Sequence, residues 1–363
     1  MSKKQQVKHI ESSDEQGSRK GSRRSTVFSS LNPAIPTEVF DSYWRFAVLR
    51  QDVFFARLEG KSKPWSNDPI LNEYKFTNAY RASDRVSQFL IRNVIYDGSQ
   101  EPDELFFRIL LFKLFNKIET WKLLETKLGG VSWGAYRYSD YDRVLSEAMS
   151  AKETIYSAAY IMASGHKIFN VGRKHQGHLK LLELMLSDAV PQRIVECKSM
   201  REAFELLRSY PLIGDFLAYQ LVTDLNYSAL TSFSEMEFTI PGPGAKDGIR
   251  KCFQSLGGLS EIDIIRLMAD RQEYEFDRLG LKFRDLWGRR LQLIDIQNLF
   301  CEVDKYARVK HPLIAGVSGR TRIKQKFKQT EDPVQYFYPP KWNLEVPVMS
   351  APKRARKRQG VLF

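Results

Sequence analysis

The sequence has few cysteines and no long apolar run. Its three cysteines, Cys197, Cys252 and Cys301, lie far apart and form no CxxC pair. A disulfide framework, a structural zinc site and a four-cysteine iron–sulfur site are therefore not expected. His175 and His178 have no third ligand nearby, so we interpret them as part of a basic surface. No stretch reaches the about eighteen apolar residues of a membrane span, and the polar N-terminus lacks the apolar region of a secretory signal. We expect an intracellular protein without a metal ion, a cofactor or a membrane partner.

The net charge of +13 is unevenly distributed along the chain. Residues 1–36 carry seven Lys and Arg against three Asp and Glu, and residues 310–363 carry twelve against three. Residues 37–309 therefore balance at 37 of each sign. Basic tails give a salt-sensitive attraction to nucleic acid that does not depend on base sequence. We expect DNA as a partner, with any specificity residing in the neutral core.

The composition predicts four segments. Residues 1–36 form a disordered polar tail, because they are rich in Ser, Lys and Gln and poor in large apolar groups. Residues 37–309 form an all-α domain, because apolar residues recur at helical spacing and strand patterns are scarce. Thr37 and Asp68-Pro69 are residue types that begin helices. Residues 310–345 are expected to form a basic, aromatic arm that packs on this core in an extended conformation.

Residues 346–363 form the fourth segment, a basic tail. Its stretch 352–358 reads PKRARKR and resembles a nuclear localisation signal. We therefore predict that the protein is nuclear.

A helical hairpin organises the domain. An apolar helix halts at Tyr210-Pro211, and a second helix begins directly after Gly214. The free backbone N–H groups at the start of the second helix suit a phosphate oxygen. The turn resembles the helix-hairpin-helix of DNA glycosylases, which reads apolar-Pro-Gly-apolar-Gly, although Leu212 stands where the first Gly belongs. On the hairpin alone, an ordinary corner between two core helices is an equal alternative.

Several separated motifs together resemble one family. They lie at 64–71, in a predicted helix at 74–85, in the hairpin at 210–214, at 237–245 and at 295–306. The family is the helical domain associated with hydroxymethyldeoxyuridine DNA kinases and alpha-glutamyl/putrescinyl thymine pyrophosphorylases, a branch of the DNA-glycosylase-like helix-hairpin-helix fold. The resemblance covers residues 37–345.

This resemblance implies work on thymine hypermodification. In that chemistry a kinase activates hydroxymethyluracil in DNA as a pyrophosphate ester, and an amine then displaces the pyrophosphate. The sequence contains no GxxxxGK[ST] loop. We therefore expect the displacing or base-binding role, on a modified pyrimidine in DNA, with a separate kinase and oxygenase of the same pathway supplying the substrate.

Two acidic residues are the catalytic candidates. Glycosylases of this fold carry a carboxylate shortly after the hairpin, at the pocket that receives a flipped base. Glu235 and Glu237 lie 21 and 23 residues after Gly214, and we favour Glu237 because it directly precedes the segment 238–244. A carboxylate there would stabilise a developing cation or act as a base toward an amine. Asp247 is the second candidate, and a surface loop is the alternative interpretation of Glu237.

The candidates for substrate and phosphate binding lie around a Pro-Gly segment. Gly242 and Gly244 permit close backbone approach, and Arg250 and Lys251 follow in the first turns of the next helix. With Gly214 they would hold a pyrophosphate or a DNA phosphate. A simple Pro-Gly turn is an equal alternative.

Two predicted helices add polar candidates. Lys75, Asn78, Arg81 and Arg85 recur at three- and four-residue steps and predict one polar helix face. From this row we select Asn78 and Arg81, and from the later helix Lys305, as substrate-binding candidates. A solvated helix face is the commoner explanation of such rows.

Three functional hypotheses remain open. The first is a DNA base-modifying enzyme, and the second is a monofunctional DNA glycosylase. The third is a DNA-reading module without catalysis. A strand-cleaving lyase is not expected, because Asp215-Phe216 follow the hairpin where such enzymes place a nucleophilic Lys.

Overall fold

The computed structural model describes residues 33–158, 162–328 and 336–346. The predicted nuclear localisation signal and nearly all of the predicted N-terminal tail lie outside the described residues. Fourteen α-helices occur in the described part of the chain, beside one short sheet in which β1 (Ile35–Pro36) pairs antiparallel with β2 (Phe253–Ser255). The all-α prediction is confirmed. None of the described helices is long and apolar enough to cross a membrane.

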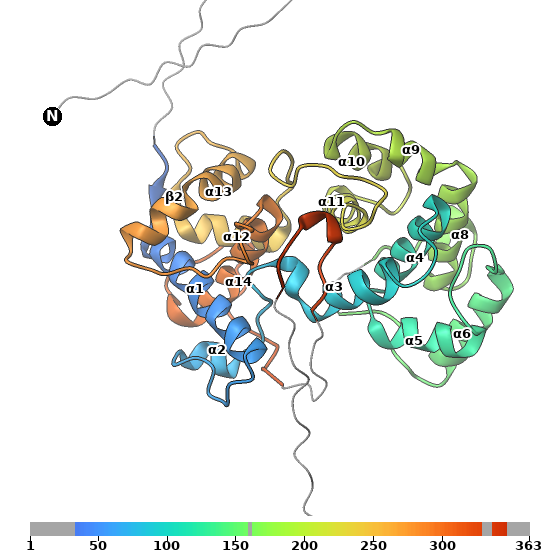
Figure 1. Ribbon diagram of the computed structural model, residues 1–363, viewed down its shortest axis with the longest axis horizontal. Helices are drawn as coiled ribbons and strands as arrows, with labels where there is room; N and C mark the ends of the chain where they lie inside the picture. The colour runs from blue at the N-terminus through green and yellow to red at the C-terminus, as the bar shows by residue number, and fades with distance from the viewer. Residues whose placement is uncertain (1–32, 159–161, 329–335, 347–363) are drawn as a thin grey trace, which may run out of the picture.

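The helices form two lobes, as Figure 1 shows. The first lobe combines helices from the N-terminal and the C-terminal parts of the chain. It contains α1 (Glu38–Leu58), α2 (Pro69–Glu73), α12 (Pro243–Cys252), α13 (Glu261–Arg278) and α14 (Leu293–Lys310). Thr37 accepts a hydrogen bond from the Val39 N–H at 3.2 Å, and Asp68 accepts one from Ile70 at 2.8 Å, so both predicted helix starts are confirmed.

Helices α12 and α14 lie in close contact because Gly248 has no side chain. A Cβ atom there would lie 2.0 Å from the carbonyl oxygen of Phe300. Real Cβ atoms do not approach so closely, so only glycine permits this separation of the two helix axes.

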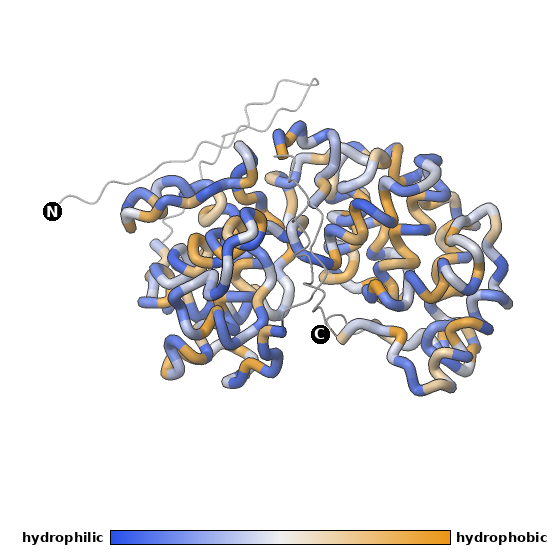
Figure 2. Tube along the Cα trace, turned by 60° about the horizontal axis from the view of Figure 1, so that its bottom comes forward, coloured by the Kyte–Doolittle hydropathy of each residue, from blue (hydrophilic) through white to orange (hydrophobic). Residues whose placement is uncertain are grey.

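The second lobe surrounds the buried helix α4 (Pro102–Phe115), of which residues 105–115 are all buried. Around it lie α5 (Ile118–Leu128), α6 (Tyr138–Ser150), α7 (His166–Phe169), α8 (Lys174–Ser187), α9 (Val190–Glu196), α10 (Met200–Arg208) and α11 (Asp215–Leu225). In Figure 2 hydrophobic stretches run through the helices of both lobes.

The two histidines of helix α8 do not lie on the surface, where we expected them from the sequence. His175 and His178 are fully buried in the second lobe, so their assignment to a basic surface was wrong. His175 Nε2 lies 2.7 Å from Asp142 Oδ1, and His178 Nδ1 lies 2.8 Å from the Tyr156 hydroxyl. Burial lowers the pKa of His178 to about 4, so this ring is neutral at neutral pH.

The segment between the lobes departs from the predicted helix at 74–85. Residues 74–80 are not helical, and they lead into the 3₁₀ turn η1 (Arg81–Ser83), α3 (Arg85–Phe89) and the π-helix η2 (Leu90–Ile95). The predicted single helix face of Lys75, Asn78, Arg81 and Arg85 is therefore wrong.

Hydrogen bonds to carboxylate side chains are the physical reason. The backbone N–H of Thr77 donates to Glu302 at 3.0 Å and that of Asn78 to Asp84 at 2.7 Å. The N–H of Arg81 donates to Asp295 at 2.8 Å. These side chains satisfy the donors that an α-helix would pair with its own carbonyl groups.

Helices α10 and α11 form the hairpin around residues 209–214. Leu212 adopts the left-handed conformation, with φ of 68°, at the position where the resembling motif has its first Gly. This backbone conformation costs a non-glycine residue about 1–2 kcal/mol. The Leu212 side chain packs over Gly165, where an added Cβ would lie 2.8 Å from Leu212 Cδ1. Leu212 thus adopts a backbone conformation that usually favours glycine.

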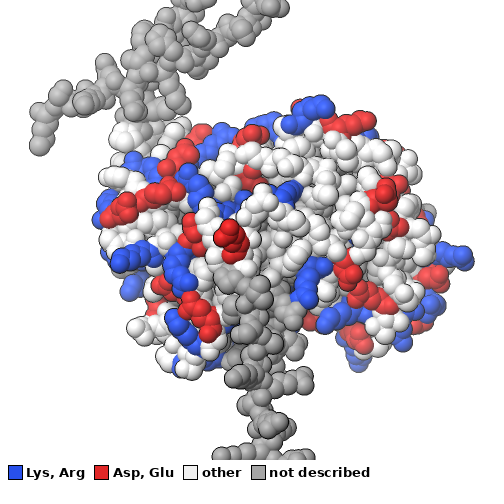
Figure 3. Space-filling view, viewed as in Figure 1, with Lys and Arg blue, Asp and Glu red and all other residues white. Residues whose placement is uncertain are grey.

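Residues 336–346 lie where the two lobes meet and include η3 (Pro340–Trp342), drawn in red at the centre of Figure 1. Around this point the visible surface carries Lys and Arg intermingled with Asp and Glu, without a large area of one sign (Figure 3). This distribution matches the balanced charge of residues 37–309.

Candidate functional site

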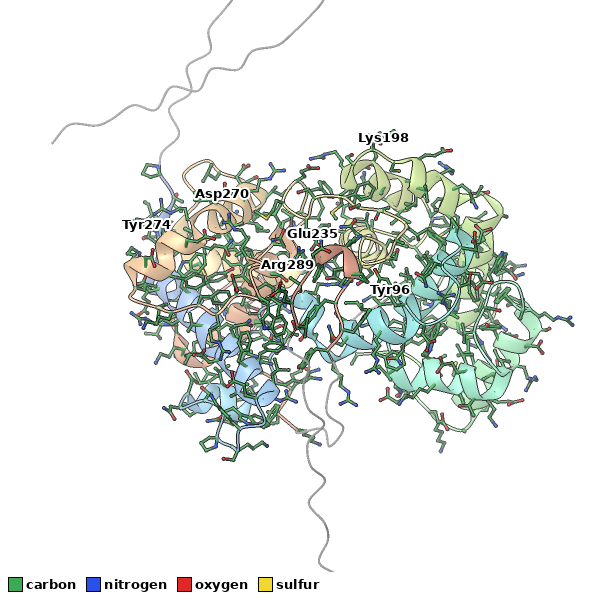
Figure 4. The ribbon with its side chains drawn as sticks, in the orientation of Figure 1. Tyr96, Lys198, Glu235, Asp270, Tyr274 and Arg289 are labelled. Atoms are coloured by element: carbon green, nitrogen blue, oxygen red, sulfur yellow. The ribbon has the colours of Figure 1, made fainter. Side chains whose placement is uncertain are left out.

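Charged residues, most of them buried, gather with Trp342 where the lobes meet, and we call this group the junction cluster. Its members come from separate parts of the chain: Arg81, Lys113, Asp224, Glu235, Arg289, Asp295, Lys341 and Trp342. Glu235 and Arg289 lie near the centre of the molecule in Figure 4, whereas Lys198, Asp270 and Tyr274 lie at the outer edges of the two lobes. Charged side chains are seldom buried unless they are paired, so each needs an explanation.

Arg81 connects the first lobe to α11 of the second. Its Nη1 donates to Asp224 Oδ1 at 2.8 Å and to the Tyr227 hydroxyl at 3.1 Å, and its Nε donates to Gln220 at 3.2 Å. Lys113 Nζ of α4 lies 3.1 Å from the other oxygen of Asp224. Burial alone would raise the pKa of Asp224, but the charges of Arg81 and Lys113 bring it below its usual range. Asp224 is therefore a fixed anion.

Glu235 is the buried acid in the loop after the hairpin. It is 8% exposed, and its carboxylate accepts a hydrogen bond from Arg289 Nη2 at 2.7 Å. Burial raises the pKa of Glu235 above its usual range, and Arg289 opposes this shift. A carboxyl group of this kind holds a proton more readily than a surface glutamate.

Asp295 lies close to this pair at the start of α14. Its two oxygens accept the backbone N–H groups of Arg81 and Gln292, at 2.8 and 3.0 Å. Burial raises the pKa of Asp295 to about 7, and the negative charge of Glu235 adds to the shift. Two interacting carboxyl groups with raised pKa values are a feature typical of functional sites.

Residues 336–346 cover the junction cluster. The Cζ atom of Arg289 lies 3.7 Å from the ring centre of Trp342, and the Trp342 ring meets that of Tyr227 edge to face at 5.6 Å. Lys341 Nζ donates to the backbone carbonyls of Ser228 and Thr231, at 3.0 and 2.6 Å. Burial lowers the pKa of Lys341 to about 8. This segment therefore supplies both a ring and an amine to the junction cluster.

Of the predicted binding residues, Arg81 belongs to the junction cluster and Asn78 lies beside it. The Asn78 amide donates to the Ser83 carbonyl at 2.6 Å and shapes the turn that carries Arg81. Lys305 pairs with Glu302 at 2.6 Å and lies over the Phe76 ring. Lys305 is thus on the first-lobe side of the turn, outside the cluster.

The predicted catalytic residues lie outside the junction cluster. The side chain of Glu237 is exposed, and its backbone carbonyl accepts a hydrogen bond from Arg266 at 2.8 Å. Asp247 is buried under the loop after α14, where it pairs with Arg320 at 2.6 Å and accepts the Ser318 N–H at 2.8 Å. These interactions, with the Ser318 hydroxyl, hold the pKa of Asp247 below its usual range against the effect of burial. Asp247 thus contributes to fixing this loop.

The predicted phosphate-binding glycines lie at helix starts and at close contacts. Gly214 is the N-cap of α11, and a Cβ there would meet no atom within 4 Å. A Cβ on Gly242 would lie 2.6 Å from the Phe216 ring, and one on Gly244 would lie 3.1 Å from Cys301 Sγ. Gly242 and Gly244 therefore serve packing between helices.

The predicted cations of α12 point in different directions. Arg250 is at the surface and pairs with Glu261 at 2.9 Å. Lys251 is only 2% exposed and pairs with Asp304 at 3.0 Å between α12 and α14. Lys251 is committed to an internal ion pair, so these two residues do not form one phosphate clamp.

Several cluster members escaped the sequence analysis. Asp224 and Lys113 each lie in a mainly apolar stretch of a helix. A charged residue in such a stretch is the signal from which a buried ion pair could have been predicted. Arg289 lies beside Arg290, and Lys341 lies in an aromatic and Pro-rich stretch, so nothing in the sequence distinguishes either from a surface cation.

Comparison with known proteins identifies the family. Residues 37–316 match the family described as the helical domain of 5-hmdU DNA kinase. A 5-hmdU DNA kinase of Bacillus phage SP10 is 27% identical over 296 residues, which cover 76% of this chain and 46% of the relative. The chain thus spans about half the length of this curated relative. No solved structure matches significantly. The family model covers most of the chain, which therefore belongs to the 5-hmdU DNA kinase helical-domain family.

Proposed function

We propose that this protein acts on a hydroxymethyluracil-type base in DNA, at the junction cluster between the lobes. One observation carries this proposal: separated segments of a domain from the 5-hmdU DNA kinase family converge on buried acids and cations. In the finer form of the proposal, an amine displaces pyrophosphate from the activated hydroxymethyl group. A separate oxygenase and kinase would supply that substrate.

The displacement assigns roles to the cluster. The amine nitrogen forms a bond to the hydroxymethyl carbon, while the carbon–oxygen bond breaks and its electron pair leaves with pyrophosphate. The proton lost by the amine passes to a carboxylate. Glu235 and Asp295 suit this step, because burial raises both pKa values, that of Asp295 to about 7, and a general base works best when its pKa is near the working pH. Arg289, which pairs with Glu235, would stabilise the departing negative charge.

The site requires movement before it accepts a base. Trp342 covers Arg289, and Lys341 is anchored on the loop after α11. A base flipped out of the helix would reach Glu235 once this segment moves aside. The cation and the acid would then both face the base.

Mass spectrometry of nucleosides tests the proposal. DNA carrying hydroxymethyluracil pyrophosphate is incubated with the protein and a pool of amines. A new base mass with released pyrophosphate is the expected result. Free base would instead identify a glycosylase, and DNA that is bound but unchanged would identify a reading module. Either result contradicts the displacement reaction.

Two matched variants test which of two neighbouring carboxylates, Glu235 or Glu237, takes part in the reaction. Glu235→Gln removes the buried acid, whereas Glu237→Gln changes an exposed one two residues away. We expect Glu235→Gln to lower the rate by about 10²-fold or more with DNA affinity retained, as for loss of a general base. Glu237→Gln is expected to have little effect. A larger loss of rate in Glu237→Gln than in Glu235→Gln would instead identify Glu237 as the catalytic residue. Asp247→Asn is measured in the same assay.

We also propose that the basic ends of the chain attract DNA and that the protein is nuclear. Residues 353–358 contain five Lys and Arg. Removal of residues 347–363 should reduce DNA affinity and flatten its dependence on salt concentration, because fewer counterions are released. Binding that does not depend on salt would contradict this attraction. A fluorescent fusion that stays outside the nucleus would contradict the nuclear assignment.

A further inference from the structure

The first lobe contains a second candidate site, a pocket of about 400 Å³. It lies between α1, the loop after α1, α2 and Phe327, and it shares no lining residue with the junction cluster. Three cations line it, Arg50, Arg57 and Lys63, and no Asp or Glu does. The pocket therefore favours an anion.

Arg50 is the buried cation of this pocket. It is 8% exposed, and its Nε donates to the Thr77 carbonyl at 2.8 Å. Its Nη2 donates to the Phe76 carbonyl at 3.4 Å. Its Nη1 is buried and has no hydrogen-bond partner among the described residues. A buried guanidinium N–H without an acceptor is costly, and an anionic ligand would satisfy it once the Arg50 side chain turns toward the pocket.

Aromatic rings form the other walls. Trp65 is held by a hydrogen bond from its Nε1 to the Lys61 carbonyl at 2.7 Å. Lys63 Nζ lies 5.0 Å from the Trp65 ring centre and 5.2 Å from that of Phe327. Arg57 Cζ lies 5.1 Å from the Trp65 ring. Tyr74 and Phe76 complete the aromatic lining.

We propose that this pocket binds a phosphorylated nucleoside. The phosphate would lie among Lys63, Arg57 and Arg50, and the planar base would lie against the aromatic walls. Its volume is within the range of ligand pockets, about 300–1,000 Å³. An acidic peptide would leave the rings unused, whereas a nucleotide uses both the charge and the aromatic surface. The nucleotide is either free or at the 5′ end of a DNA strand.

Calorimetric titration of the full chain tests this site. The ligands are dTMP, thymidine, inorganic phosphate and a short oligothymidylate with and without its 5′ phosphate. We expect saturable binding of dTMP, weakened about tenfold or more when either the phosphate or the nucleoside is absent. Tighter binding of the 5′-phosphorylated oligonucleotide than of both dTMP and the same oligonucleotide without its 5′ phosphate identifies a DNA end as the source. Tighter binding of dTMP identifies the free nucleotide.

Variants at the exposed edge of the pocket provide the control. Lys63→Gln and Trp65→Leu should each weaken dTMP binding about tenfold. Lys61→Gln removes a nearby charge of the same loop that does not line the pocket and should change affinity less than about twofold. Glu235→Gln should bind dTMP like the wild type, so this test is independent of the proposed reaction.

Three outcomes would overturn the proposal. The first is no saturable binding of dTMP or of the oligonucleotide up to about 1 mM. The second is an affinity for thymidine or for inorganic phosphate that equals the affinity for dTMP. The third is an equal loss of affinity in Lys61→Gln and Lys63→Gln, because the attraction would then be nonspecific. Melting curves verify that every variant is folded.

Discussion

Asp295 offers a direct test of how burial determines the charges of the junction cluster. Burial raises its pKa to about 7 in the folded protein, against about 3.9 in an unfolded chain. The folded protein therefore holds a proton that the unfolded chain has already lost between about pH 4 and pH 7. The stabilisation from this group is complete below about pH 4 and is lost as the pH rises through about 7. Asp295→Asn removes this dependence.

The magnitude follows from the shift in pKa. About three pKa units at 1.36 kcal/mol each give a change on the order of 4 kcal/mol between pH 4 and pH 8. The variant also loses one hydrogen bond, since an amide cannot accept both the Arg81 and the Gln292 N–H groups. That loss costs about 1–2 kcal/mol at every pH. We expect Asp295→Asn to be less stable than the wild type near pH 4 and more stable near pH 8.

Urea unfolding at several pH values measures this difference. The free energy of unfolding of the variant minus that of the wild type is plotted against pH, so that other titrating groups cancel. Asp277→Asn, which removes a carboxylate at an exposed position of α13, is the matched control. A flat line for Asp295→Asn, or a variant that loses stability as the pH rises, would refute the assignment of a proton to Asp295.

Four further substitutions test the packing and one buried ion pair. Gly248→Ala should unfold the first lobe or cost at least about 3 kcal/mol in a urea titration, since its Cβ meets the Phe300 carbonyl oxygen. Gly214→Ala, with open space, should cost under about 1 kcal/mol. Lys113→Met should destabilise by about 3 kcal/mol because Asp224 loses a buried partner, and a loss under 1 kcal/mol would contradict that ion pair. Trp342→Ala should loosen the segment 336–346, which faster tryptic cleavage after Lys341 would report.

The apolar pattern was sufficient to predict the fold class and several helix starts. Thr37 and Asp68 cap their helices as their residue types require, and α10 and α11 lie where their apolar spacing placed them. Such features depend on neighbours within a few residues, so they can be read along the chain. Leu212 is the instructive exception, because its backbone conformation is maintained by the fold around it.

The segment 74–85 was mispredicted because two of its three carboxylate acceptors are distant in sequence. Glu302 and Asp295 accept N–H groups from residues more than 200 positions away. No local pattern reports such partners. The same holds for the acid after the hairpin. Spacing limited the choice to Glu235 and Glu237, but only the lobe packing buries Glu235 against Arg289.

The junction cluster is better explained by function than by stability. Buried ion pairs such as Arg81–Asp224–Lys113 contribute little net stability, because desolvation of the charges offsets their attraction. Well-packed apolar residues would hold the lobes together at least as firmly. The cluster nevertheless contains Glu235 and Asp295 with raised pKa values, beside a buried amine of lowered pKa at Lys341. Asp295, with a pKa of about 7, and Lys341, with a pKa of about 8, exchange protons near neutral pH, and a purely structural junction has no need of such groups.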